Sequence, residues 1–432
     1  MKKMLIALIV LVVILAGAGT WLALVKFEGE KPTIQITPEA LYLGQKLSFK
    51  VEDKKSGVAE VRVEAVQGGK STTLLTEGFP KKTPFIEKNI SLRPLPQGVK
   101  DGEIRIKITA RDHSWRGGNP VTLERDVIID TRPPQLTVQG GLHYINQGGA
   151  GLVAYQTSEE IPKNGVQVGE VFFPGYAIEK DRYLAYFAVL PNAPSDLSPA
   201  VMAEDQAGNR AKAGFRLILK RKAFKKDKIQ VTDSFLKNII PYFTERDPNL
   251  RGTPLEIFLA VNQKQREADH QKIKELCQNT AAQPLWSGSF LRLPNSKPMA
   301  SFAEERTYWH NGKEIDRQIH LGVDLASLAQ SPIPAANSGR VIFAGELGIY
   351  GKTVLIDHGC GLFSMYSHLS RIETEEKKEV KRGDILGRTG TTGLAGGDHL
   401  HFSMLVNGIF VNPIEWWDEH WIKDNIEKKL KS

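Results

Sequence analysis

Three short segments in the last third of the chain carry residue types and spacings that could bind a metal and cleave a bond. They are His320-Leu-Gly-Val-Asp324, Tyr366-Ser-His368 and His399-Leu-His401. Polar or small residues alternate with apolar ones from His320 to Leu325. This period of two predicts a strand that carries His320 and Asp324 on one face. By the same logic, His399 and His401 are expected on one face of a second strand.

Two imidazoles and one carboxylate are a suitable donor set for zinc. Three protein ligands leave a fourth coordination position for water, which is the arrangement of catalytic sites and not of closed structural sites. Zinc lowers the pKa of such a water towards ~7 and so provides a nucleophile at neutral pH. The segments therefore predict a mononuclear zinc hydrolase site; the alternative is a set of histidines that only satisfy the core.

These segments resemble the LytM/lysostaphin family of zinc endopeptidases, which cut peptide cross-links in peptidoglycan. The family pattern is His-x-x-x-Asp, then Tyr-x-His-Leu, then a glycine-rich stretch that ends in His-Leu-His-Phe. Residues 320–324, 366–369 and 392–402 match it in order and at similar spacing. The resemblance extends over roughly residues 286–417, about a third of the chain.

The resemblance implies a role for each of five residues. His320, Asp324 and His401 would bind zinc, and His368 and His399 would be the catalytic pair. This pair would orient or deprotonate the water and stabilise the oxyanion. The remaining histidines are expected to be structural or exposed to solvent.

Two positions and one short segment depart from the family pattern. Ser403 stands where the family often has an acidic residue, and Cys360 lies in a glycine-rich turn. The segment from Ser301 to Arg306 replaces a commoner Phe-Gly-x-Arg turn. No departure touches a predicted ligand, but together they leave the shape of the substrate groove open.

Length and composition predict a globular protein of several domains with an anionic partner. The chain has 432 residues, of which 41% are hydrophobic and 25% charged, and this length indicates two to four domains. The net charge of +8 favours membrane surfaces, cell-wall polymers or nucleic acid. The sequence contains no nucleic-acid-binding motif, so we expect an envelope partner.

Residues 1–26 are predicted to be a transmembrane anchor. The apolar run from Met4 to Val25 would extend about 33 Å as a helix, enough for a hydrocarbon core of ~30 Å. The lysines at positions 2 and 3 predict a cytoplasmic N-terminus, with the rest of the chain on the periplasmic or cell-wall side of the cytoplasmic membrane. A cleaved signal segment is the alternative, with residues 16–18 as its cleavage site.

Two immunoglobulin-like β-sandwiches are predicted, over residues 32–130 and 135–219. Runs such as residues 61–65 and 104–108 alternate with period two between Gly, Pro and Asn breakers. Residues 110–119 and 203–209 share a short Asp…Asn feature near the end of each predicted domain, which resembles bacterial immunoglobulin-like modules. These domains would serve as spacers or bind protein partners.

A helical connector is predicted over residues 220–285. It begins with a basic run at 220–228, expected to be a solvated linker, and Asp233-Ser234 is expected to cap the first helix. Residues 253–256 form a capping box with proline at the first helical position. Whether these helices cross the groove stays open, as does pairing of the two cysteines, Cys277 and Cys360.

Residues 286–432 are predicted to form a catalytic domain with a mostly antiparallel sheet. The fold class is thus multidomain and mainly β. The predicted function is that of a membrane-anchored zinc metalloendopeptidase acting on peptidoglycan stems or cross-links. The alternative is a non-catalytic or self-inhibited regulator of other cell-wall hydrolases, and a zinc peptidase acting on proteins is a third hypothesis.

Overall fold

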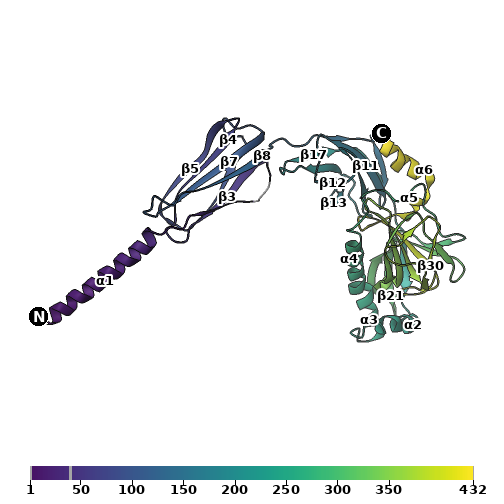
Figure 1. Ribbon diagram of the computed structural model, residues 1–432. Coiled ribbons are helices and arrows are strands. Elements are labelled where there is room, and N and C mark those ends of the chain that lie inside the picture. The colour runs from purple at the N-terminus through teal and green to yellow at the C-terminus, as the bar shows by residue number, and fades with distance from the viewer. Residues whose placement is uncertain (1, 38–40, 432) are drawn as a thin grey trace. The chain divides into compact units, whose positions relative to one another are not determined.

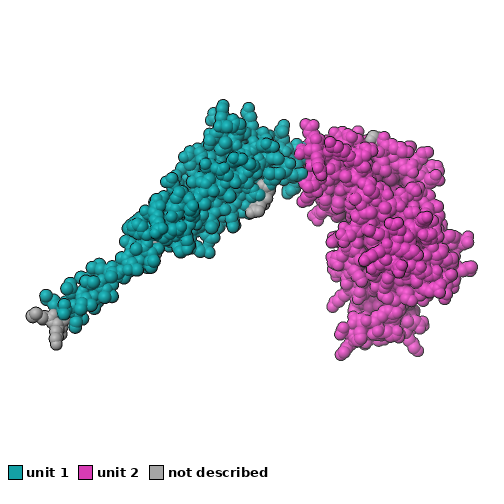
Figure 2. Space-filling model, viewed as in Figure 1, with its two compact units in different colours: residues 1–134, 204–210 teal, residues 135–203, 211–432 magenta. Residues whose placement is uncertain are grey.

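The computed structural model describes residues 2–37 and 41–431. The chain forms two compact units, which Figure 2 colours separately. The first contains residues 1–134 and 204–210, and the second contains residues 135–203 and 211–432. The candidate site lies wholly in the second unit.

The first unit begins with a single long apolar helix, α1 (Lys2–Lys26). Within it, Met4–Leu24 is long and apolar enough to cross a membrane, as a signal sequence near the N-terminus also can be. Its side chains from Met4 to Leu24 are not buried against the protein. The predicted helix is therefore confirmed, and its use as an anchor stays a prediction.

Two sheets follow in the first unit (Figure 1). One contains β1 (Thr33–Ile36), β3 (Lys46–Glu52) and β6 (Phe85–Ser91). The other has the order β2 (Tyr42–Leu43), β8 (Val121–Ile129), β7 (Gly102–Asp112), β4 (Val58–Gln67) and β5 (Lys70–Thr83). Alternate residues of β3 and β7 are buried in one apolar core, as the period-two pattern predicted. The immunoglobulin-like assignment stays a prediction.

The second unit opens with a further set of strands. One sheet has the order β14 (Tyr176–Glu179), β15 (Arg182–Ala188), β11 (Ala150–Thr157), β9 (Leu136–Val138). Another has the order β13 (Val171–Pro174), β12 (Lys163–Val168), β16 (Ala200–Glu204), β17 (Arg210–Gly214), and β10 (His143–Asn146) pairs with β18 (Leu217–Lys220). The apolar core of these strands is continuous with that of the C-terminal sheet. The two regions that were predicted as separate domains thus share one core.

The connector is only partly helical. Its helical elements are α2 (Asp233–Thr244), α3 (Pro254–Ala260), the π-helical segment η1 (Val261–Gln265) and α4 (Arg266–Leu276). The basic run ends in a strand, β19 (Lys226–Gln230), which pairs in parallel with β21 (Glu305–His310). The expectation of a linker is therefore wrong at that end, because the backbone of this basic segment pairs with β21. The side chains of Lys226 and Lys228 are exposed, as expected for a solvated segment.

Helix capping in the connector agrees with the sequence at one helix and differs at the other. Thr253 forms the predicted capping box with Glu256, and Pro254 follows it. At α2 the cap is Thr232, whose hydroxyl accepts a hydrogen bond from the Phe235 amide, and not Asp233-Ser234. Thr232 is the N-cap because its backbone is extended and lies immediately before the first helical turn. Asp233 and Ser234 are already within that turn.

The C-terminal region is built on an antiparallel sheet, as predicted. Its strand order is β20 (Lys297–Ala300), β23 (Val323–Ala326), β31 (Leu400–Val406), β27 (Leu362–Leu369), β26 (Lys352–Asp357), β25 (Gly339–Glu346), β29 (Glu379–Val380), with β32 (Ile409–Val411) beside β31. A small sheet joins β24 (Pro332–Pro334), β30 (Ile385–Arg388) and β28 (Arg371–Ile372), and β22 (Lys313–Ile319) pairs with β21. Short helical elements close the chain: α5 (Pro413–Trp417), α6 (Glu419–Ile422), η3 (Lys423–Glu427) and α7 (Lys428–Lys431).

Both cysteines and the tryptophans near the C-terminus pack in or against the apolar core. Cys277 and Cys360 are both free and buried, so the disulfide considered from the sequence does not form. The Cys360 thiol donates to the Ala282 carbonyl at 3.3 Å. Trp416 is fully buried, and its ring centroid lies 5.2 Å from that of Trp421, as expected for aromatic residues that pack against the domain.

Candidate metal centre

Asp324 and His401 face each other directly across two neighbouring strands. They are register partners in the antiparallel pair of β23 and β31, and directly opposed side chains project from the same face of a sheet. Leu400 and Phe402, on either side of His401, are each 2% exposed and pack in the core. The strand periodicity that predicted the orientation of His401 is thus confirmed.

His320 reaches the same point by a different route from the one predicted. The chain does not run as one strand from 320 to 325: β22 ends at Ile319 and β23 begins at Val323. The break passes close to His401, because a Cβ on Gly322 would lie 2.6 Å from the His401 Nε2 atom. Glycine therefore permits the approach that brings His320 to Asp324, and any larger residue would push the imidazole away.

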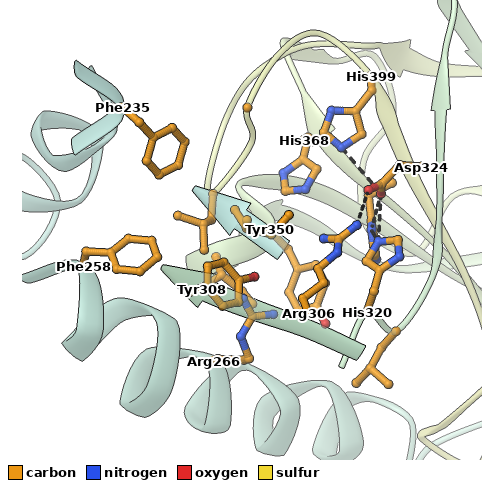
Figure 3. A pocket seen from close by; sticks show the side chains of 16 residues that line it. Phe235, Phe258, Arg266, Arg306, Tyr308, His320, Asp324, Tyr350, His368 and His399 are labelled. Atoms are coloured by element: carbon orange, nitrogen blue, oxygen red, sulfur yellow. Dashed lines mark hydrogen bonds and ion pairs between the residues drawn. The ribbon is translucent and has the colours of Figure 1, made fainter. Parts of the chain in front are cut away.

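Three donor atoms converge at this point (Figure 3). His320 Nε2 lies 3.0 Å from Asp324 Oδ1 and 3.0 Å from His401 Nδ1. His401 Nδ1 lies 2.9 Å from the same carboxylate oxygen. The structure therefore brings together the three residues that the sequence predicted as ligands, and His320 and His401 are 5% and 4% exposed.

The other ring nitrogen of each of these histidines already donates a hydrogen bond. His320 Nδ1 donates to the Ser301 carbonyl at 2.8 Å. His401 Nε2 lies 3.1 Å from Ser403 Oγ, and the Ser403 hydroxyl itself donates to the Leu321 carbonyl at 2.9 Å. Because the Ser403 proton is used there, His401 Nε2 must be the donor of its bond. The two nitrogens that face Asp324 thus present lone pairs, and three convergent lone pairs fit a divalent cation such as zinc.

Arg306 fixes the orientation of the Asp324 carboxylate. Its Nη2 atom donates to Asp324 Oδ2 at 3.1 Å, which leaves Oδ1 towards the histidines. Burial alone would raise the pKa of Asp324. The opposing effects of His320, His399 and His401 outweigh it and hold that pKa well below its usual value. Burial lowers the pKa of His401 to about 4, so at neutral pH this imidazole is neutral, as a metal ligand must be.

His368 and His399, the predicted catalytic pair, lie beside these three residues. Their ring centroids are 4.9 Å apart, and the His368 ring lies 5.7 Å from that of His401. His368 Nδ1 donates to the Thr392 carbonyl and His399 Nδ1 to the Gly397 carbonyl, each at 2.8 Å. The Nε2 atom of each ring is therefore available for proton transfer, and that of His399 lies 3.6 Å from Asp324 Oδ1.

The two rings differ in electrostatic environment. Burial, His399 and His401 hold the pKa of His368 well below its usual value. Burial also opposes the charged form of His399, but its contacts with Asp324 raise the pKa overall. His368 also has a backbone φ of 64°, a left-handed conformation that is rare for a histidine and that occurs at functional sites.

The five residues line a cavity of about 220 Å³, which lies between the C-terminal sheet region and the connector. The strand side carries His320, Asp324, His368, His399 and His401, and below it is called the strand wall. The opposite side comes from the connector, namely Phe235 of α2, Phe258 of α3 and Arg266 of α4, and is called the helix wall (Figure 3). The sequence left open whether the connector reaches the groove; the structure shows that it borders the cavity.

Polar contacts fasten the helix wall to the C-terminal region. The Asp269 carboxylate accepts the Ile349 amide at 2.7 Å. The Asn262 side-chain amide donates to Asp316 Oδ2 at 2.7 Å, and Arg246 pairs with Glu346 at 3.6 Å. Because these contacts hold the connector after α2, in η1 and in α4, the helix wall is part of the cavity and not a loose linker.

Sequence reasoning missed three residues of the cavity, Arg266, Arg306 and Tyr350. Tyr350 is 4% exposed and its ring centroid lies 5.5 Å from that of His401. Arg306 could have been found, because it ends the segment that departs from the Phe-Gly-x-Arg turn. Nothing in the sequence pattern distinguishes Arg266 from the other cations of an amphipathic helix.

Comparison with known proteins gives the following findings. The model of "Peptidase family M23" matches residues 318–413. The chain is 36% identical over 97 residues to the "DD-carboxypeptidase/endopeptidase Mpg" of Neisseria meningitidis serogroup B, covering 22% of each chain. It is 33% identical over 96 residues to the "Peptidoglycan DD-endopeptidase ShyA" of Vibrio cholerae, again covering 22% of each.

A third relative is matched almost from end to end. The chain is 36% identical over 94 residues to "Lipoprotein NlpD" of Yersinia enterocolitica, covering 22% of this chain and 96% of that one. By contrast, the match spans only about a fifth of the length of the Mpg and ShyA proteins. The shared region contains all five residues of the strand wall and none of the helix wall.

Proposed function

Because the chain belongs to peptidase family M23 through residues 318–413, we propose that it is a zinc metalloendopeptidase that hydrolyses peptide bonds in the stems or cross-links of peptidoglycan. The convergence of His320, Asp324 and His401 on one point, with lone pairs directed inward, is the observation that carries the proposal. The Mpg and ShyA relatives, named as endopeptidases, support the substrate class.

In this proposal His320, Asp324 and His401 would hold the zinc ion through the three atoms that converge. When bound, zinc supplies Lewis-acid chemistry that polarises the scissile carbonyl and makes water more acidic. The chain itself prepares the ligands: Ser301 and Ser403 fix the ring nitrogen that each histidine presents, and Arg306 fixes the carboxylate oxygen. Such supporting hydrogen bonds set the orientation of ligands.

His368 and His399 handle protons in the same proposal. Each is held through Nδ1 by a backbone carbonyl, so Nε2 faces the cavity. One ring accepts the proton that water loses as its oxygen attacks the peptide carbonyl. The C–N bond then breaks, and the proton passes to the leaving amine. The buried pocket excludes bulk water from competing for these hydrogen bonds.

We further propose that α1 anchors the protein in the cytoplasmic membrane with the catalytic region outside the cytoplasm. The helix is long enough to span the bilayer, and the sequence places lysines at positions 2 and 3 on its N-terminal side. An anchored enzyme would meet peptidoglycan that lies close to the membrane.

A digest tests the proposal. Full-length protein in detergent is incubated with purified peptidoglycan and, separately, with a folded protein substrate, and the products are identified by mass spectrometry. We expect peptides with new amino and carboxyl termini from peptidoglycan only, and none after zinc chelation. Cleavage of the protein substrate alone would overturn the substrate class, and no cleavage of either in zinc-loaded protein would overturn the enzyme proposal.

A further inference from the structure

Arg266 places a cation in the cavity opposite the candidate metal centre. It is the first residue of α4 and is partly buried among the residues that line the pocket. Figure 3 shows its side chain rising from the helix into the cavity below Tyr308. The residue belongs to the connector and lies outside residues 318–413, the region that matches the peptidase family.

A buried amide holds the Arg266 guanidinium in place. Its Nε atom donates to the Asn262 backbone carbonyl at 3.0 Å, and Nη2 donates to Asn262 Oδ1 at 2.5 Å. Asn262 is fully buried, and its own amide nitrogen donates to Asp316 Oδ2 at 2.7 Å. Asp316 therefore orients Asn262, and Asn262 orients Arg266, whose Nη1 atom donates no hydrogen bond within residues 2–37 and 41–431.

The charge of Arg266 is not neutralised by an ion pair within the described part of the chain, residues 2–37 and 41–431. Arg306, the other arginine of the cavity, is paired with Asp324 at 3.1 Å. Two acidic residues follow Arg266 in the first turn of α4, Glu267 and Asp269. Glu267 is exposed, and the buried Asp269 carboxylate, although it interacts electrostatically with Arg266, accepts its hydrogen bonds from the Ile349 amide and the Gln265 side chain. Arg266 is thus a preorganised guanidinium that has no carboxylate partner of its own there.

The surroundings of Arg266 favour an organic anion over an inorganic one. Phe258 and Tyr308 lie on the same side of the cavity, with ring centroids 5.8 Å apart. The cavity volume of about 220 Å³ lies below the ~300–1,000 Å³ of pockets for drug-sized ligands. It suits an amino-acid residue with an apolar stem and an anionic end.

We propose that Arg266 is a specificity-determining residue that binds a free carboxylate of the substrate peptide near the bond to be cleaved. This inference rests on the proposed function and names the substrate class more narrowly, as an acidic peptide. A carboxylate accepts two parallel hydrogen bonds from a guanidinium, whereas a carboxamide in the same position leaves the cation without a counter-charge. The connector therefore selects substrates by charge, while the strand wall provides the chemistry.

The experiment compares two synthetic cross-linked peptides that differ only in one group, a free carboxylate or its carboxamide, on the residue beside the scissile bond. Full-length wild type, Arg266→Gln and Arg266→Lys are assayed with both, and zinc content is measured for each protein. Lys274→Gln is the matched control, because it removes a cation from an exposed position of α4 outside this cavity. Binding of the cleaved acidic product is measured by calorimetry as a readout independent of turnover.

For the wild type we expect a preference of roughly 10- to 100-fold in kcat/KM for the carboxylate peptide, as for a hydrogen bond to a charged group. Arg266→Gln should lose that preference because its KM for the carboxylate peptide is higher. Its zinc content should be full and its binding of the acidic product weaker. Lys274→Gln should keep the wild-type preference. Arg266→Lys should recover part of it. Equal cleavage of both peptides by the wild type, or an undiminished preference in Arg266→Gln, would overturn the inference. Failure of the wild type to cleave either peptide would count against the proposed function instead.

Discussion

The strand wall and the helix wall of the cavity differ in how their polar groups are held. On the strand wall, every predicted ligand has its second donor or acceptor atom fixed by Ser301, Ser403 or Arg306. On the helix wall, aromatic rings surround one oriented cation, Arg266. In the proposals made above, the first arrangement would fix a reactive geometry and the second would recognise a ligand. On that account, chemistry and selectivity come from separate parts of this chain.

The largest effect is expected at the strand wall, from loss of a proton-transfer group. His368→Ala should lower kcat by about 10²–10⁴-fold, the usual contribution of a general acid or base. Zinc content should stay unchanged, because His368 is not among the three convergent donors. Hydrolysis rates and metal analysis of the same preparation check this. A variant that loses its zinc would show that His368 supports the metal and not the proton transfer.

Acid should also weaken the folded C-terminal region, which carries the strand wall. His358 is fully buried, its ring bonds Ser338 and Ser364, and burial lowers its pKa to about 4 from 6.5. The folded state then binds fewer protons than the unfolded state between these values, so the contribution of His358 is complete above pH 6.5 and falls as pH drops towards 4. At ~1.4 kcal/mol per pH unit the loss reaches up to ~3 kcal/mol.

Urea unfolding of wild type and His358→Gln across pH 4–7 measures this contribution. The variant should be less stable than the wild type at pH 7 and should lose less stability on acidification. The same dependence on pH in both proteins would mean that other groups govern the acid response.

A smaller effect is expected from the support of His401. Ser403→Ala removes the acceptor of the His401 Nε2 proton and should weaken zinc affinity by about 10–100-fold, as removal of such supporting groups does. Ser403→Thr keeps the hydroxyl and should retain most of the affinity. Competition with a zinc chelator gives the affinities. Equal affinity in the alanine variant and the wild type would show that Ser403 does not orient the ring.

The smallest effect tests whether the helix wall is independent of the metal. Thr253→Ala breaks the capping box of α3 and should cost about 1 kcal/mol of stability. Hydrogen exchange of the α3 amides should quicken while zinc affinity stays unchanged. Thr244→Ala, at the end of α2, is a control outside any cap box. A fall in zinc affinity in Thr253→Ala would contradict the separation of the two walls.

Sequence alone predicted the residues of the strand wall but not all of their backbone. His401 lies as strand periodicity requires and faces Asp324 across the sheet. His399 lies one residue before β31, and its Nε2 atom is 3.6 Å from the same carboxylate. The single strand through His320 was wrong, because Gly322 adopts a break that places it against His401. Residue spacing shows which side chains share a face; it does not show where backbone leaves the sheet to avoid a neighbouring side chain.

The helix wall was beyond prediction for a different reason. The buried residues of α3 and α4, such as Ile257, Phe258 and Ile273, show that each helix buries one face. An amphipathic pattern does not identify the surface that covers this face, because any apolar surface satisfies it. The pairing of β19 with β21 and the contacts of Asn262 and Asp269 decide the position of the connector, and all of them join residues far apart in the sequence.

The most direct test of the central claim measures zinc content and peptide release together in full-length wild type and His320→Ala. We predict about one zinc per chain and release of soluble peptides from purified peptidoglycan by the wild type. Both should be lost in the variant, with its fold retained by circular dichroism. A wild type that binds no zinc, or a His320→Ala variant that keeps both zinc and activity, would contradict the account of this site.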